Sequence, residues 1–278
     1  WIEEKQWEYV TTFQLTEEEH SFQNTEIVFE GLDTYADVYL NDGLVLQANN
    51  MFRTWVIPIK SILKKGDNSL KVVFKSPIQE NKEQLTSLGY TLPAGSETTE
   101  FKVSPFTRKA PYHFGWDWGP RLVTAGIWRP VYLQFWDNTK IEDVQIIQNS
   151  LDDDIAKLSG IVTIQSVVDK AIDIELYGTL VSAHLKPGIN TVNVDFTIEQ
   201  PKRWWPNGWG DPYLYTVKTV LKEDGVAVDE HSDKIGLRTI ELVQETDSIG
   251  ESFYFKVNDE PIFIKGANYI PQSHFLPS

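Results

Sequence analysis

The sequence has 278 residues, of which 41% are hydrophobic and 23% are charged, as is ordinary for a soluble globular protein longer than one domain. A formal net charge of −15 argues against nucleic acid and anionic membranes as partners, since both attract clustered Lys and Arg. The absence of cysteine excludes disulfides, thiolate metal sites and cysteine nucleophiles, and the five His show no metal-ligand spacing. We therefore expect no metal and no cofactor.

The first residue is Trp, and no leader sequence or long apolar run follows it. At the other end, Phe275 to Ser278 follow an apolar stretch that has nothing left to pair with. We expect the chain to be cut at both ends.

The first 76 residues alternate between short apolar-polar runs and turn residues, which predicts antiparallel strands. Asn41-Asp42-Gly43 is a hairpin signal, because glycine readily supplies the positive φ that such a turn needs. One helical turn is expected within residues 57–65. The expected strands are residues 9–13, 26–29, 36–40, 44–46 and 69–74.

Residues 80–107 are polar and poor in strand signals, and they precede an aromatic motif. A disordered linker is one interpretation. Linkers seldom lie inside a domain, so a loop over a binding face is the better one.

The motif is Tyr112-His113-Phe114-Gly115-Trp116-Asp117-Trp118-Gly119-Pro120-Arg121. Its Gly and Pro residues predict an ordered loop, because they break regular structure. An indole face beside a carboxylate suits a sugar, whose C–H face packs on the ring while its hydroxyls bond to the acceptor. The alternative is that Trp116 and Trp118 are buried at a sheet edge and Asp117 caps a turn.

A strand over 128–136 closes the first domain, and strands begin again after a polar turn at Asp137-Asn138. Their spacing predicts an immunoglobulin-like sandwich of about 100 residues. Trp204-Trp205-Pro206-Asn207-Gly208 interrupts it, either as a sugar platform or, as we favour, as rings that brace the packing between domains. The expected strands are residues 144–147, 159–167, 172–180, 191–198, 213–221 and 226–232.

From residue 238 onwards the pattern changes to a hairpin and one further strand. The hairpin joins Phe253–Val257 to Ile262–Lys265 through a turn at Asn258 to Pro261. Gly266–Pro271 is predicted to be a strand of the buried type, because it is short and apolar.

Five stretches, in order along the chain, resemble the N-terminal part of β-mannosidases of glycoside hydrolase family 2. They are residues 31–34, 38–41, 113–131, 204–208 and 265–271. The resemblance implies an all-β chain with three parts. These are a jelly-roll, galactose-binding-like sandwich over 1–137, an immunoglobulin-like sandwich over 138–237, and the entry to a truncated (β/α)₈ barrel over 238–278. A barrel needs roughly 250 residues.

The resemblance further implies a retaining exo-β-mannosidase as parent, acting on terminal non-reducing β-D-mannose. Retaining hydrolysis takes two carboxylates, in this family glutamates on later barrel strands, with Asn before the acid/base. No Asn-Glu dipeptide occurs in the sequence, so we expect the chain alone to be inactive. Asp117 and Trp116 are implied to contact the bound mannose, and the partners are a β-mannoside and the missing barrel.

Two alternatives stay open: a freestanding pair of carbohydrate-binding modules, and another family 2 exo-glycosidase acting on glucosaminide or galactoside. Gly266–Pro271 speaks against the modules, which have no use for it. Gln272 to Phe275 replace what is often an acidic pair of positions in the family, which leaves the role of His274 open. No Asn-X-Ser/Thr acceptor is present. We therefore expect a bacterial source, with a periplasmic or secreted location favoured.

Overall fold

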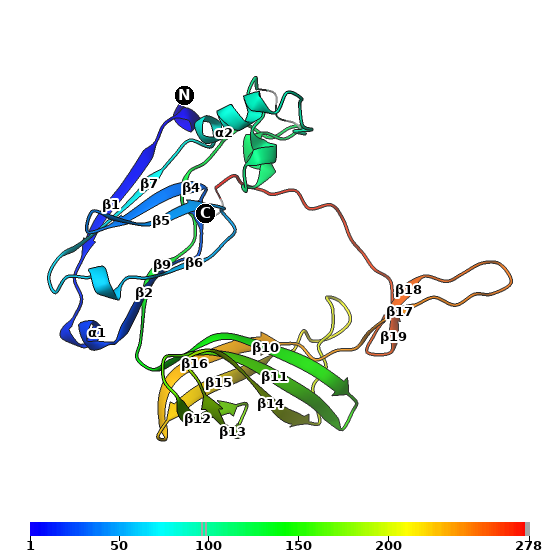
Figure 1. The fold of residues 1–278 in the computed structure, drawn as a ribbon. Coiled ribbons are helices and arrows are strands. Elements are labelled where there is room, and N and C mark those ends of the chain that lie inside the picture. Colours follow the sequence, from blue (N-terminus) through cyan, green and yellow to red (C-terminus); the bar gives the residue numbers. More distant parts are fainter. Residues whose placement is uncertain (96, 98, 276–278) are drawn as a thin grey trace. The chain divides into compact units, whose positions relative to one another are not determined.

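A computed structural model describes residues 1–95, 97 and 99–275, and most of them lie in or between β-strands (Figure 1). The all-β fold class is confirmed. The chain divides into two compact units. One is residues 1–137 with the segment that starts at Tyr269, and the other is Asn138–Asn268. The described residues contain no helix long and apolar enough to cross a membrane. The division into three domains stays a prediction.

The first unit is a sandwich of a four-stranded and a three-stranded antiparallel sheet (Figure 1). In spatial order, the larger sheet holds β1 (Trp7–Phe13), β7 (Asn68–Phe74), β4 (Tyr35–Leu40) and β5 (Gly43–Asn49), and the smaller holds β6 (Trp55–Pro58), β2 (Asn24–Phe29) and β9 (Val131–Trp136). A two-stranded ladder joins β3 (Leu32–Asp33) to β8 (Gly126–Ile127).

Alternation of apolar and polar residues builds the core of this sandwich. Along β4 and β7 every second side chain is buried, because successive side chains point to opposite faces of a strand. Phe29, Val38 and Phe74 are completely buried. Each such side chain stabilises the fold by roughly 1.5–3 kcal/mol relative to the exposed state.

The hairpin between β4 and β5 is present, but its turn differs from the expected one. Asn41 and Asp42 carry the positive φ angles, 51° and 68°, while Gly43 is already the first residue of β5. Asn tolerates the left-handed region better than most residues. The Asn41 side chain also accepts a hydrogen bond from Ser69 N (3.0 Å) and donates one to Ile62 O (2.8 Å), which holds the turn in place.

The expected loop over residues 80–107 is wrong in its first part, which is helical. Helix α2 spans Pro77–Ser87. Ser76 caps it by accepting a hydrogen bond from Gln79 N, and Pro77 occupies the first turn, where a missing N–H costs nothing. The other short helices are α1 (Glu17–Ser21) and four 3₁₀ turns, η1 (Ile2–Glu4), η2 (Lys60–Ile62), η3 (Ser104–Phe106) and η4 (Pro111–Phe114).

The second unit contains an immunoglobulin-like sandwich, in which β10-β11-β14 form one sheet and β13-β12-β15-β16 the other (Figure 1). The bounds are β10 (Thr139–Leu151), β11 (Ile155–Ser166), β12 (Lys170–Leu176), β13 (Thr179–Leu185), β14 (Gly188–Glu199), β15 (Tyr215–Glu223) and β16 (Val226–Ile235). The single strand expected over 172–180 is wrong. Tyr177 and Gly178 turn the chain there with φ of 47° and 82°.

The aromatic pair Trp204-Trp205 packs within the second unit. The Trp204 ring lies so close to Gly236 that a Cβ there would come within 2.9 Å of it, and the Trp205 ring is equally close to Gly210 at 2.8 Å. Asn258 Nδ2 donates to Trp204 O (3.0 Å), and Asn258 Oδ1 accepts from Thr239 N (3.1 Å). All of these contacts lie inside one unit, and the expected bracing between domains stays a prediction.

A small sheet follows, with β17 (Ile240–Val243), β18 (Tyr254–Val257) and β19 (Glu260–Ile262). The expected hairpin is present, and its turn residues Asn258 and Asp259 have positive φ. The expected strand over Gly266–Pro271 is wrong, because these residues are exposed and form no ladder with the described chain. A strand needs a neighbour to pair its N–H and C=O groups.

Candidate functional site

The loop Gly115–Gly119, called here the Trp-Asp-Trp loop, follows η4 at the surface of the first unit. Gly115 has a φ of 120°, a conformation open to glycine, and Gly119 N donates to Trp116 O (3.2 Å) to close a tight turn. Trp116 is 42% and Trp118 70% exposed, and Asp117 is exposed between them. The expected ordered loop is thus present, and its rings are not buried at a sheet edge.

The two ends of this loop are bonded to each other. Leu122 N donates to His113 O (3.0 Å), and Arg121 Nη1 donates to Phe114 O (3.0 Å). Phe114 is buried in a small apolar cluster with Ile78 and Val103. The exposed loop is therefore built on a packed base.

Lys109 and Asp33 form a buried ion pair in the first unit. Lys109 Nζ donates to Asp33 Oδ2, and both side chains are almost completely removed from solvent. Lys109 Nζ also donates to Thr124 O (3.0 Å) and Thr124 Oγ1 (2.9 Å), so its three protons are all bonded. Burial lowers the pKa of Lys109, and the charge and hydrogen bond of Asp33 oppose that shift.

His113 extends this network toward the loop. Thr124 Oγ1 gives its own proton to Asp33 Oδ2 (2.8 Å) and accepts from Lys109, so it can only accept from His113 Nδ1, which lies 3.4 Å away. The proton of the neutral ring is thereby placed on Nδ1. Burial and, after it, the nearby Lys109 charge lower the pKa of His113 to about 4, although the Asp33 charge opposes them. His113 is thus uncharged at neutral pH.

His274 contacts the loop from the end of the chain. Its Nε2 donates to Tyr112 O (3.1 Å), and its ring centroid lies 5.7 Å from that of Tyr112 and 5.8 Å from that of His113. A Cβ on Gly119 would come within 3.8 Å of the His274 ring. The segment from Tyr269 therefore packs beside the Trp-Asp-Trp loop.

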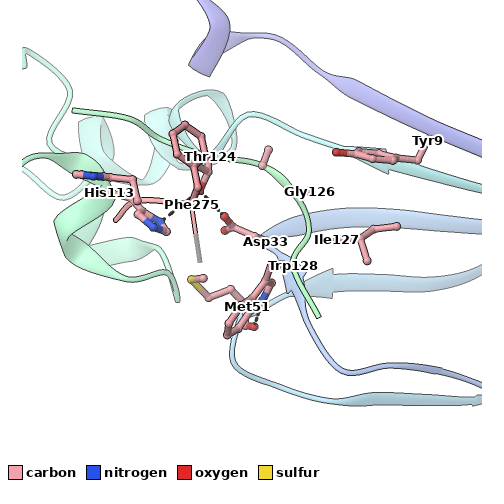
Figure 2. Close-up of a pocket in the computed structure, with 11 residues that line it drawn as sticks. Tyr9, Asp33, Met51, His113, Thr124, Gly126, Ile127, Trp128 and Phe275 are labelled. Atoms are coloured by element: carbon pink, nitrogen blue, oxygen red, sulfur yellow. Dashed lines mark hydrogen bonds between the residues drawn. The ribbon is translucent and has the colours of Figure 1, made fainter. Parts of the chain in front are cut away.

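A pocket of about 250 Å³ opens beside this network (Figure 2). Asp33, His113 and Thr124 provide polar walls, and Tyr9, Trp128 and Phe275 provide aromatic ones. Trp128 is fixed by a hydrogen bond from its Nε1 to Met51 O (2.8 Å), drawn as a dashed line in Figure 2. Among the described residues no group of acidic, His or Cys side chains could hold a metal ion.

The predicted site residues do not line this pocket. Trp116 lines a separate pocket of about 220 Å³ with Pro93, Pro105 and Pro111, and Asp117 lies in the exposed turn. Sequence reasoning missed the supporting residues Asp33, Lys109, His113 and Thr124. A lysine buried inside a domain has no local sequence signature, although Asp33 lies in one of the stretches that carry the family resemblance.

Two family models match the chain. The one described as glycosyl hydrolase 2 galactose-binding domain-like matches residues 1–129, and the one described as glycosyl hydrolases family 2 matches residues 139–238. The chain belongs to glycosyl hydrolase family 2. The first match covers the first sandwich except β9 and includes the Trp-Asp-Trp loop, and the second match covers the immunoglobulin-like sandwich.

Family relatives cover the whole chain. Beta-mannosidase B of Aspergillus terreus is 35% identical over an alignment of 284 positions, which covers 100% of this chain and 33% of that protein. Beta-mannosidase B of Aspergillus niger is also 35% identical, with the same coverage. The chain thus spans about a third of the length of these curated relatives. Because they are fungal, they do not support the expected bacterial source.

Solved structures also resemble the whole chain. A beta-D-mannosidase from Dictyoglomus thermophilum superposes with a TM-score of 0.91 at 35% identity, over 100% of this chain and 35% of its own. The exo-chitosanase of Amycolatopsis orientalis has a TM-score of 0.71 at 21% identity, over 99% of this chain and 30% of its own. The second likeness shows the fold alone.

Proposed function

We propose that this chain is the non-catalytic N-terminal part of a retaining exo-β-mannosidase, which removes terminal non-reducing β-D-mannose from β-mannosides. The observation that carries the proposal is the likeness over the full chain to proteins named as mannosidases, at 35% identity and a TM-score of 0.91. The names of these 35% identical proteins favour mannoside over glucosaminide as the substrate.

The chemistry requires a division of labour between this chain and the rest of the polypeptide. Retention of configuration takes an acid/base and a nucleophile about 5–5.5 Å apart. The chain has no Asn-Glu dipeptide, the family pattern for the acid/base. It therefore supplies sugar contacts while the catalytic barrel supplies both glutamates. The chain alone should release no p-nitrophenol from its β-mannoside.

Asp117 and Trp116 are the residues proposed to bind the sugar. A carboxylate accepts hydrogen bonds from hydroxyls, and an indole face covers the apolar face of a pyranose. Their exposure on a loop with a packed base supports this role, since the loop can present both groups without reorganisation.

The test is Asp117→Ala in the full-length protein, with Asp143→Ala as a control for loss of an exposed carboxylate on β10. A hydrogen bond to a charged acceptor contributes roughly 1.5–3 kcal/mol. The Asp117 variant should therefore lose about one to two orders of magnitude in kcat/KM at an unchanged melting temperature. Asp117→Asn should lose less, because the amide oxygen still accepts.

If Asp117 only caps a turn, the ordering reverses. The melting temperature would then fall by an amount equivalent to about 1 kcal/mol, and kcat/KM would stay at the wild-type value. Micromolar mannose binding by the isolated chain would instead favour the binding-module alternative, since half a pocket should bind only in the millimolar range, about 4 kcal/mol.

A further inference from the structure

The Trp-Asp-Trp loop needs support from outside itself to hold one orientation. Its two tryptophans leave 42% and 70% of their surface exposed, so the loop gains little from burying its own side chains. Its direction is then set where it joins the fold, at Phe114 and Arg121. At that junction, Arg121 is hydrogen-bonded to other segments of the chain.

Arg121 donates in three directions at once. Its Nε lies 3.1 and 3.2 Å from the two carboxylate oxygens of Glu3, and its Nη1 lies 3.0 Å from Glu97 Oε1 and 3.0 Å from Phe114 O. Its guanidinium carbon also lies 5.5 Å from the centre of the Phe114 ring. One side chain thus joins η1, Glu97 and the start of the loop.

Glu97 makes this junction stiff. Its side chain is 1% exposed, and its carboxylate also accepts from Ser104 N (3.1 Å) and Val103 N (3.4 Å). A buried carboxylate with fixed donors cannot follow a moving arginine without losing hydrogen bonds. The Arg121 guanidinium is therefore bonded to an acceptor that is itself fixed.

We propose that Arg121, held by Glu97, is a positioning residue that fixes the direction in which Asp117 and Trp116 face the sugar. This inference rests on the proposed function. Arg121 acts through the Phe114 carbonyl and not on the substrate. Only the planar fork of arginine reaches these acceptors together, since a lysine ammonium is a single point charge.

The variant that separates charge from geometry is Arg121→Lys in the full-length protein, because it keeps a cation for Glu97 and removes the fork. Arg53→Lys is the matched control, because Arg53 is exposed and stacks on Trp55 at 4.5 Å. Arg121→Lys should lower kcat/KM about tenfold, as expected for a displaced binding group, while Arg53→Lys leaves it unchanged.

A double-variant cycle with Asp117→Ala tests whether Arg121 acts through Asp117. The double variant should lose no more activity than Asp117→Ala alone, and amide exchange across residues 113–122 should quicken in Arg121→Lys. Wild-type kinetics in Arg121→Lys, or losses that multiply fully in the double variant, would overturn the inference. Wild-type kinetics in Asp117→Ala would instead overturn the proposed function.

Glu97→Gln serves if Arg121→Lys does not fold. It leaves Arg121 bonded to Phe114 O and removes the charge of its partner, at the cost of one hydrogen bond from Val103 N or Ser104 N. The value of kcat/KM should therefore fall a few-fold, with faster exchange across 113–122. Wild-type kinetics and exchange in Glu97→Gln would also contradict the proposal.

Discussion

Replacing His113 by Asn should remove a pH-dependent part of the stability of the first unit. The pKa of His113 falls from 6.5 to about 4 in the fold, first because of burial and then because of the Lys109 charge, with His274 also lowering it and Asp33 opposing. The unfolded chain therefore binds a proton near pH 6.5 that the folded chain refuses until about pH 4. Stability is complete above pH 6.5 and falls as the pH drops through this window.

The magnitude follows from the size of the shift. One pKa unit corresponds to about 1.36 kcal/mol, and most of the shift is felt between pH 6.5 and 4.5, so the wild type should lose about 2 kcal/mol there through His113. The side-chain amide that His113→Asn introduces has an N–H to offer Thr124 and no proton to gain. Comparing the two pH values within each protein cancels any difference in baseline packing.

The assay is urea unfolding followed by tryptophan fluorescence at pH 6.5 and 4.5, together with an NMR titration of the His113 ring. The wild type should lose about 2 kcal/mol more than His113→Asn between the two pH values. Equal losses in the two proteins, or a ring that titrates near pH 6.5, would refute the account of a neutral buried histidine.

Two further stability measurements test the rest of the architecture. Lys109→Met should lower the free energy of unfolding by about 3–5 kcal/mol, because it leaves Asp33 buried without its cation. Adding Asp33→Asn should recover part of that loss. An equal loss in the exposed control Lys65→Met would contradict the account of a buried ion pair. Trp205→Ala should cost about 2 kcal/mol for a half-buried ring, against a few tenths for the more exposed Trp209→Ala. Equal melting temperatures for these two would mean that Trp205 braces nothing.

The strands were predictable because their signal is local. Apolar and polar residues alternate along β4 and β7, which predicts one buried and one exposed face for each strand. The Asn-Asp-Gly stretch predicts a hairpin regardless of which of its residues has the positive φ. The signal fails where two strands join through an unusual turn. Tyr177 is an aromatic residue in the left-handed region, so Gly178 alone marked the break between β12 and β13 in the sequence.

Helix α2 was missed although its start is marked. Ser76-Pro77 followed by Glu80 is a recognisable beginning, with a capping hydroxyl, a proline in the first turn and an acidic residue near the helix N-terminus. Its polar composition outweighed these marks. Only Pro77, Ile78 and Asn81 are buried, so the helix has almost no apolar stripe to reveal its period.

The candidate site was likewise predictable only in part. Trp116 and Asp117 are neighbours in the sequence and form one visible motif, whereas Asp33, Lys109 and Thr124 meet only after the chain has folded. No periodicity links Asp33 to Lys109, which lies 76 positions later. Such pairing is a property of the tertiary fold.

The exposure of the tryptophans is itself an argument about function. Burying an aromatic ring gains about 25 cal/mol for each Å² removed from water, so Trp116 and Trp118 leave stability unused at the surface. A loop without a ligand could reach more stability by folding these rings inward. Here Arg121 and the buried Phe114 hold its base in place instead. Rigid support beneath exposed aromatic rings is expected where the rings bind a ligand, because an ordered binding surface loses less conformational entropy on binding than a flexible one.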